Sequence, residues 1–352
     1  MICDPAFAAV DEAFCAGLDK GGAALTVIAR GRVLVDIWGG AAAEGRPWEH
    51  DTVANVFSVT KGVLAAVANV LIQRGELRPD APVRAYWPQF TTDVTVAELL
   101  SHQAGLAALS EPSDIYDWQA MTDALTGQKP WWPPGSAHGY HAVTFGWLAG
   151  ELVRRASGRE LDTLVADLGV PDLWIGLPRT EWHRAADLPP PEAGPVTGPA
   201  LFAAMSDANS LTAKAFVGLP DLLVPGVATT DAWREARIPA ANGHATARAL
   251  ATMYAQVLDG DHTLATTAHS DGPDLVLHGN TRFGLGFMLP NEVRPFAPNP
   301  TAFGHSGAGG ALAFADPDAG LALGFTTNRL ITSAAGPDPR WVPILGVLYQ
   351  RI

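Results

Sequence analysis

Strand-like and helical segments occupy different parts of this chain, and their order limits the folds that it can adopt. Residues 24–38 form two strand-like runs around Gly31, which is the pattern of a β-hairpin. Further strand-like runs lie near the C-terminus, and much of the chain between is apolar at helical spacing. The C-terminal runs are 282–288, 310–315 and 320–326; the main helical patterns are 55–74, 95–102, 144–157 and 246–258, with shorter ones at 7–18 and 343–351.

This order favours an antiparallel sheet built from the two termini, with helices inserted between its parts. We expect an α/β (α+β) chain in which residues 1–92 and 245–352 form a sheet domain and residues 93–244 form a mainly helical domain. The functional site is expected between the two. Residues 187–199 are rich in proline and predict a surface loop, which is a candidate lid.

Composition and charge exclude several classes of protein. A hydrophobic fraction of 48% in 352 residues supports a sizeable core, and the net charge of −13 disfavours nucleic acid as a partner. We expect no membrane-spanning segment and find no pattern of a signal peptide. The two cysteines, Cys3 and Cys15, are expected to be reduced, which predicts a cytoplasmic protein. The oligomeric state stays open, a homo-oligomer included.

Ser58 and Lys61 are the first candidates for chemistry. Residues three apart lie on the same face of a helix, and a serine needs a nearby base to act as a nucleophile. Lys61 is the only lysine or arginine between His50 and Arg74, in an otherwise apolar segment. Desolvation there would lower the pKa of a lysine toward neutrality, whereas an arginine could not release its proton. The structural alternative is that Ser58 caps a helix while Lys61 extends to solvent.

Four segments, one of which contains Ser58 and Lys61, occur in an order that is typical of one family. They are FSVTKG at 57–62 (the first landmark), LLSHQAGL at 99–106, PGSAHGYH at 134–141 (the second landmark) and FGHSGAGG at 303–310 (the third landmark). Together they resemble the class C β-lactamase-like serine hydrolases, which include penicillin-binding proteins, D-aminopeptidases and family VIII carboxylesterases. The resemblance runs from about residue 53 to residue 329, and it implies the β-lactamase/penicillin-binding-protein-like fold, with an antiparallel sheet flanked by helices.

The resemblance implies a role for each landmark. Ser58 would attack a carbonyl and form an acyl-enzyme. Lys61 would hold the Ser58 hydroxyl in place and deprotonate it. Tyr140 would complete the proton shuttle and pass a proton to the leaving group; as a base it would need a lysine cation to favour its phenolate. A core aromatic residue is the structural alternative for Tyr140. No metal or organic cofactor is implied.

The third landmark supplies the expected substrate-binding groups. His305 stands where many relatives carry lysine, and it would donate a hydrogen bond into the site or serve structure alone. Gly307 would let the substrate lie against the strand edge. The oxyanion hole would use the backbone N–H groups of Ser58 and Ala308. His102 is expected to be structural.

Two departures from the family pattern point away from antibiotic hydrolysis. The second landmark lacks the usual asparagine two residues after Tyr140, and the third lacks a fixed cation at His305. We therefore expect a serine carboxylesterase, and the resemblance to the esterase branch implies small, short-acyl esters as its substrates. The alternatives are a β-lactamase or D-amino-acid amidase or peptidase on the same fold, or a binding protein without catalysis.

Two other kinds of site are disfavoured. The sequence GHSGA at 304–308 nearly matches the nucleophile elbow around Ser306, but in that fold the histidine follows the serine, and no histidine follows His305. His138 and His141 are three apart, but the chain lacks the tighter His-Glu-x-x-His ligand set of zinc hydrolases.

Overall fold

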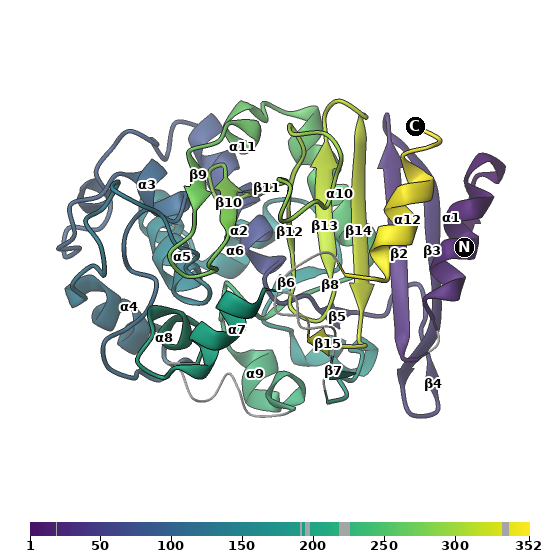
Figure 1. Cartoon of the computed structure of the whole chain (residues 1–352), viewed down its shortest axis with the longest axis horizontal. Helices are drawn as coiled ribbons and strands as arrows, with labels where there is room; N and C mark the ends of the chain where they lie inside the picture. Colours follow the sequence, from purple (N-terminus) through teal and green to yellow (C-terminus); the bar gives the residue numbers. More distant parts are fainter. Residues whose placement is uncertain (19, 191, 194–197, 218–225, 333–337) are drawn as a thin grey trace.

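A ten-stranded antiparallel sheet is built from both ends of the chain (Figure 1). The computed structural model describes residues 1–18, 20–190, 192–193, 198–217, 226–332 and 338–352. Along the sheet the order is β1-β3-β2-β14-β13-β12-β11-β10-β9, and β4 pairs with β3. Its strands are β1 (Ile2–Cys3), β2 (Gly22–Ala29), β3 (Arg32–Ala43), β4 (Arg46–Pro47), β9 (Ser270–Pro273), β10 (Asn280–Phe283), β11 (Met288–Leu289), β12 (Phe303–Ser306), β13 (Leu312–Asp316) and β14 (Leu321–Thr327).

The two ends of the chain meet in the middle of this sheet. Strand β2 pairs with β14 from Ala29 opposite Leu321 to Ala23 opposite Thr327. The hairpin expected around Gly31 is present as β2 and β3. The predicted antiparallel sheet from both termini is therefore confirmed.

Helices cover both faces of the sheet, so its central strands are buried. Helix α10 packs behind β2, β13 and β14 in the view of Figure 1, and α12 lies in front of the sheet with α1 packed against it. Every residue of β14 is buried. A Cβ atom at Gly324 would lie 2.2 Å from the Ala247 carbonyl oxygen, so the absence of a side chain there lets α10 approach the sheet.

The remaining helices lie mostly on the left of Figure 1, around the end of the sheet that carries β9. Each is too short or too polar to span a bilayer in the described part of the chain. The helices are α1 (Ala8–Ala16), α2 (Thr60–Gln73), α3 (Val96–Leu100), α4 (Trp118–Gly127), α5 (Thr144–Ser157), α6 (Leu161–Ala166), α7 (Pro199–Ser206), α8 (Leu211–Val217), α9 (Asp231–Glu235), α10 (Ala247–Asp259), α11 (Thr263–Thr266) and α12 (Trp341–Leu348), with 3-10 turns η1 (Pro5–Phe7), η2 (Val83–Ala85), η3 (Arg179–Arg184) and η5 (Val227–Thr229).

Two smaller sheets complete the fold. One has the order β5-β8-β6, and in the other β15 pairs in parallel with β7. Their strands are β5 (Ala54–Asn55), β6 (Leu173–Ile175), β7 (Glu192–Ala193), β8 (Gly243–Ala245) and β15 (Ile331–Thr332). Of the proline-rich segment 187–199, residues 191 and 194–197 lie outside the described residues, so the lid stays a prediction. The domain boundaries at 92/93 and 244/245 stay a prediction too.

The helix expected over 55–74 begins later than the sequence pattern indicates. Residues 54–55 pair with β8 as strand β5, and Phe57 has a positive φ of 46°. The helix itself starts at Thr60. Strand pairing with a segment almost 190 residues away thus replaces the first helical turn, and Ser58 lies in the turn that precedes α2.

Candidate active site

Ser58 lies in a turn that is fixed by hydrogen bonds on both sides. The Val56 N–H donates to the Gly243 carbonyl (2.8 Å), and the Gly243 N–H donates to the Thr60 hydroxyl (2.8 Å). The left-handed conformation of Phe57 is uncommon for a residue with a side chain, and such conformations cluster at functional sites. Ser58 is partly exposed, whereas the residues on both sides of this turn are buried.

Lys61 is fully buried beneath Ser58. Its Nζ lies 3.2 Å from Ser58 Oγ, and it donates to the backbone carbonyls of Ala142 (2.7 Å) and Ala240 (3.0 Å). Burial lowers its pKa well below the ordinary value. The expected proximity of Ser58 and Lys61 is therefore present, although Ser58 precedes the helix; the Lys61 N–H donates to the Ser58 carbonyl (3.0 Å) and continues the turn.

Tyr140 lies beside Lys61 and is 5% exposed. The lysine Nζ is 4.8 Å from the centre of the tyrosine ring, and Phe283 stacks on that ring at 6.1 Å. Burial raises the pKa of Tyr140, and the Ser58 hydroxyl opposes this rise. The phenol is therefore protonated at neutral pH, and the lowered pKa of Lys61 disfavours the lysine cation that a phenolate would need.

His305 also borders Tyr140, with its ring centre 5.9 Å from that of the tyrosine. Its Nδ1 lies 2.6 Å from the Ser306 carbonyl oxygen. Because a carbonyl only accepts, Nδ1 carries the proton and the buried, unpartnered Nε2 offers a lone pair. Burial lowers the pKa of His305 to about 3, so a second donor is absent from this ring at neutral pH.

Gly307 makes a close approach to the nucleophile turn. A Cβ atom there would lie 2.3 Å from the Val56 carbonyl oxygen, so the space beside Gly307 is filled by the chain's own backbone. Ala308 follows in an exposed turn. The predicted contribution of Gly307 and Ala308 to substrate binding stays a prediction.

Three further histidines near Tyr140 bind the protein itself. His141 donates from Nδ1 to the Gly139 carbonyl (2.7 Å) and accepts at Nε2 from the Leu106 N–H (3.0 Å). His138 Nε2 lies 2.9 Å from the Thr281 hydroxyl. His102 accepts from the His141 N–H (3.1 Å) under the Tyr140 ring, as a structural role predicts.

Two charged residues near Tyr140 were not singled out from the sequence. The Asp274 carboxylate accepts from the backbone N–H of Tyr140 (3.1 Å) and from those of Val276 and Leu277 (2.8 Å each), which fixes the second landmark. Arg294, in the loop between β11 and β12, acts electrostatically on Tyr140 and on His305. Neither lies in a recognisable motif.

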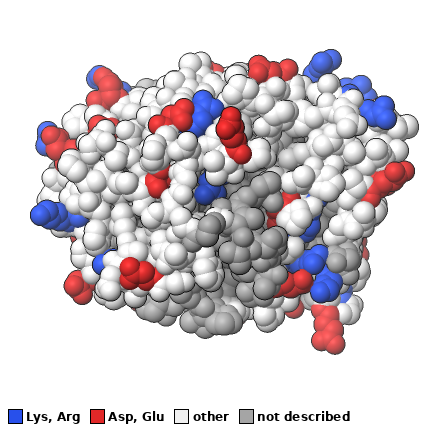
Figure 2. All heavy atoms as spheres, in the orientation of Figure 1, with Lys and Arg blue, Asp and Glu red and all other residues white. Residues whose placement is uncertain are grey.

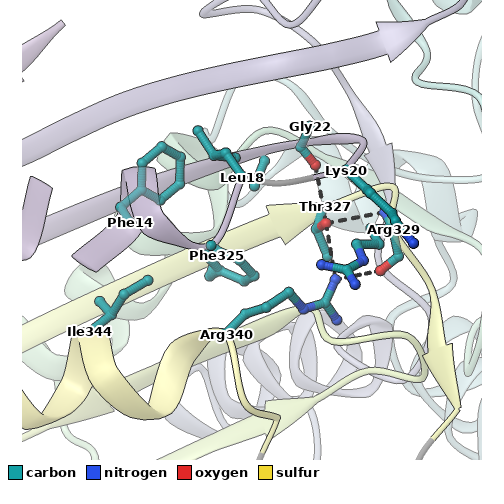
Figure 3. Close-up of a pocket in the computed structure, with 11 residues that line it drawn as sticks. Phe14, Leu18, Lys20, Gly22, Phe325, Thr327, Arg329, Arg340 and Ile344 are labelled. Atoms are coloured by element: carbon teal, nitrogen blue, oxygen red, sulfur yellow. Dashed lines mark hydrogen bonds between the residues drawn. The ribbon is translucent and has the colours of Figure 1, made fainter. Parts of the chain in front are cut away.

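A small cavity lies away from these residues, between α1, β2, β14 and α12 (Figure 3). Phe14, Phe325 and Ile344 line one end, and Arg329 and Arg340 line the other. Arg340 pairs with Asp338 and donates to the Arg329 and Gly309 carbonyls. It thereby links the end of β14 to the turn that carries Ala308.

Acidic and basic side chains are interspersed on the face shown in Figure 2. Among the residues described there, the basic groups are scattered rather than aligned in the stripe that tracks a phosphate backbone.

Comparison with known proteins agrees with the order of the landmarks. The Beta-lactamase family matches residues 10–343. The Esterase/beta-lactamase LipL of Mycobacterium tuberculosis is 33% identical over 366 aligned residues, covering 95% of this chain and 84% of that protein.

Solved structures resemble the whole chain. A family VIII carboxylesterase superposes with a TM-score of 0.90 at 35% identity, covering 100% of this chain and 99% of the other. A penicillin-binding protein homologue from Caulobacter crescentus gives a TM-score of 0.88 at 36% identity with the same coverage. The expected fold is confirmed, and the chain belongs to the beta-lactamase family.

Proposed function

We propose that this protein is a serine carboxylesterase that hydrolyses small, short-acyl esters through an acyl-enzyme on Ser58. The observation that carries the proposal is the buried Lys61 amine, 3.2 Å from Ser58 Oγ, with a pKa well below its ordinary value. A neutral amine at that distance is a base in hydrogen-bond reach of the nucleophile.

In the first step Lys61 accepts the Ser58 proton as Ser58 Oγ attacks the ester carbonyl. The two backbone carbonyls that accept from Lys61 Nζ hold the amine in place, and they stabilise the ammonium that forms. We assign the oxyanion hole to the N–H groups of Ser58 and Ala308, with Gly307 setting the approach of the strand to the nucleophile turn.

Tyr140 acts as the acid in this scheme. Its raised pKa keeps the phenol protonated, so it donates to the leaving alcohol oxygen as the carbon–oxygen bond breaks. The Lys61 ammonium returns a proton to the phenolate. Water then attacks the acyl-enzyme, with the same groups working in reverse, which releases the acid and regenerates Ser58.

The preference for esters is supported by the relatives and by the residues around Tyr140. One relative is named an esterase/beta-lactamase and one structural neighbour a family VIII carboxylesterase. His141, which follows Tyr140, and the neutral His305 both hydrogen-bond to the protein backbone, so neither supplies the amide grip or the cation of the antibiotic-hydrolysing pattern.

A cytoplasmic location belongs to the same proposal. It rests on Cys3 and Cys15, which are both free thiols in the structure. Fractionation of cells that express the protein from its own gene would test it, and recovery in an exported fraction would contradict it.

Hydrolysis of p-nitrophenyl butyrate tests the mechanism. With a chelator present, we compare the wild-type protein with Ser58→Ala and Ser306→Ala. The Ser306 variant removes the hydroxyl of the rejected nucleophile elbow from the neighbouring strand. We expect the Ser58 variant to lose at least about a thousandfold in kcat/KM and the Ser306 variant to retain most of it.

Mass spectrometry of the quenched reaction should show one butyryl group on the wild-type protein and none on the Ser58 variant. Equal activity of the wild-type and Ser58→Ala proteins would refute the assignment. Turnover of nitrocefin but not of the ester would favour the β-lactamase alternative. A flat profile from acetyl to dodecanoyl esters would refute the short-acyl preference.

A further inference from the structure

Arg294 is a partly buried cation without a protein partner. Its Nε is buried with no hydrogen-bond partner, and its side chain has no ion pair or hydrogen bond with the residues that the structure describes. Only its backbone is held: the Arg294 N–H donates to Asn291 Oδ1 (2.8 Å), and its carbonyl accepts from the Phe296 N–H (3.1 Å). The loop is thus ordered around a guanidinium that it does not neutralise.

A partly buried guanidinium has lost part of its water and is stabilised by an acceptor that pairs with the charge. Arginine is rarely buried without a carboxylate or several acceptors, because withdrawing a guanidinium from water is costly. The carboxylate that acts electrostatically on Arg294 is that of Asp274, whose oxygens already accept from three backbone N–H groups and from the Thr281 hydroxyl. The free guanidinium therefore fits an anionic ligand that arrives from solution.

The position of Arg294 indicates which part of a substrate would meet it. It follows β11, which pairs with β12 at Met288 opposite Gly304, next to His305. Its charge acts on the Tyr140 phenol and on the His305 ring. In the proposed mechanism Tyr140 protonates the leaving alcohol, so the side of the substrate nearest Arg294 is the alcohol side.

We propose that Arg294 is a specificity-determining residue that binds a carboxylate on the alcohol portion of the ester. This deepens the proposed function and rests on it, because it names the substrate class of the same site: short-acyl esters of hydroxy acids or of phenols that bear a carboxylate. Arg294 supplies the fixed cation that the third landmark lacks at His305. A planar guanidinium pairs with a carboxylate through two parallel hydrogen bonds.

Two butyrate esters that differ mainly in charge test the proposal. In meta-carboxyphenyl butyrate the leaving phenol carries a carboxylate, and in meta-carbamoylphenyl butyrate it carries a neutral amide of similar shape. Both give the same butyryl-enzyme, so a difference in kcat/KM reports the acylation step alone.

Four proteins are compared: the wild type, Arg294→Gln, Arg294→Lys and a control, Arg282→Gln. The control removes an arginine from β10 that is paired with Asp271 (3.0 Å) and also donates to the Pro290 carbonyl (3.1 Å), so it reports any effect of loosening the loop that carries Arg294. We expect Arg294→Gln to lower kcat/KM for the charged ester by about tenfold to a hundredfold, as for a charge-assisted hydrogen bond, and to leave the neutral ester within about threefold. Arg282→Gln should leave both unchanged, and Arg294→Lys should recover part of the loss.

Other outcomes overturn the proposal in identifiable ways. Equal losses on both esters would mean that Arg294 acts through Tyr140 or through folding rather than on the substrate. No loss on either ester would mean that it binds nothing in the reaction. Phenyl hemiglutarate carries a carboxylate on its acyl chain, and phenyl valerate is its neutral counterpart. If Arg294→Gln lost activity selectively on phenyl hemiglutarate and not on meta-carboxyphenyl butyrate, the anion would bind on the acyl side, which would contradict the assignment.

Failure of the proposed function gives a different signature. In that case Ser58→Ala would hydrolyse the neutral butyrate ester as fast as the wild type does, whatever Arg294 contributes. Only the inference about Arg294 fails if hydrolysis of the neutral ester depends on Ser58 while the ratio of kcat/KM for the charged and neutral esters is the same in the wild type and in Arg294→Gln.

Discussion

Replacing Gly307 by alanine tests how the nucleophile turn is positioned. The new Cβ would lie 2.3 Å from the Val56 carbonyl oxygen and 3.3 Å from its carbonyl carbon, whereas ordinary contacts begin at 3.4 Å. Backbone atoms cannot rotate away as a flexible side chain can, so the strand end and the turn must separate by about 1 Å. Ser58 lies two residues after Val56, and the displacement passes directly to it.

The magnitudes follow from that displacement. Overpacking of this kind typically destabilises a folded protein by about 1–3 kcal/mol. A shift of about 1 Å at a reacting group typically lowers the rate by about a hundredfold. We expect Gly307→Ala to lower both the unfolding midpoint in urea and kcat for p-nitrophenyl butyrate by amounts in these ranges.

Gly127→Ala is the matched control. Gly127 ends α4, and a Cβ atom there meets nothing within 4 Å, so both stability and activity should be retained. If Gly307→Ala matched this control, the packing argument would be wrong. If it lost activity at unchanged stability, Gly307 would be serving the substrate directly, as expected from the sequence, rather than spacing the two backbone segments.

Three further predictions concern the proton-transfer groups and the buried histidines. Lys61→Ala should lower kcat/KM by about a thousandfold, with partial recovery on adding methylamine; full activity without the amine would contradict a base at this position. Tyr140→Phe should lower kcat by about 10²–10⁴-fold at an unchanged melting temperature, since only the hydroxyl is lost; an equal rate would leave the ring with a packing role alone. The pKa is lowered to about 4 for His141 and to about 3 for His244 and His305, so the unfolded chain binds protons below about pH 6.5 while the folded protein does not. The free energy of unfolding should therefore fall by about 2 kcal/mol per histidine between pH 7 and pH 5, and urea midpoints that match at the two pH values would refute this.

Short-range patterns made the sheet and several helices predictable. The turn at Gly31 marks the β2–β3 hairpin, and Gly158, with a left-handed φ of 67°, ends α5 where the sequence predicts. Two expectations failed: the start of α2, and the continuous strand over 282–288, which is split between the end of β10 and the start of β11. The apolar pattern continues through residues 55–59, but pairing with β8 overrides it, and nothing local records a partner so distant in sequence.

The chemistry of the site was predictable only where it is carried by side chains in motifs. Ser58, Lys61 and Tyr140 could be found by spacing and order. The acceptors that hold Lys61 are the carbonyls of Ala142 and Ala240, and a backbone carbonyl leaves no trace in residue identity. Arg294 stands in a loop without a motif, and only the folded structure brings its charge to Tyr140.

The pairing of β2 with β14 has a consequence for how the protein is synthesised. Residues 23–29 leave the ribosome about 300 residues before their neighbours at 321–327. The amine of Lys61 likewise waits for residue 240 before its last acceptor exists. Until residues 321–327 are available, the edge of β2 that faces β14 stays uncovered and the nucleophile stays unassembled, and pairing over so long a stretch of chain makes folding slow.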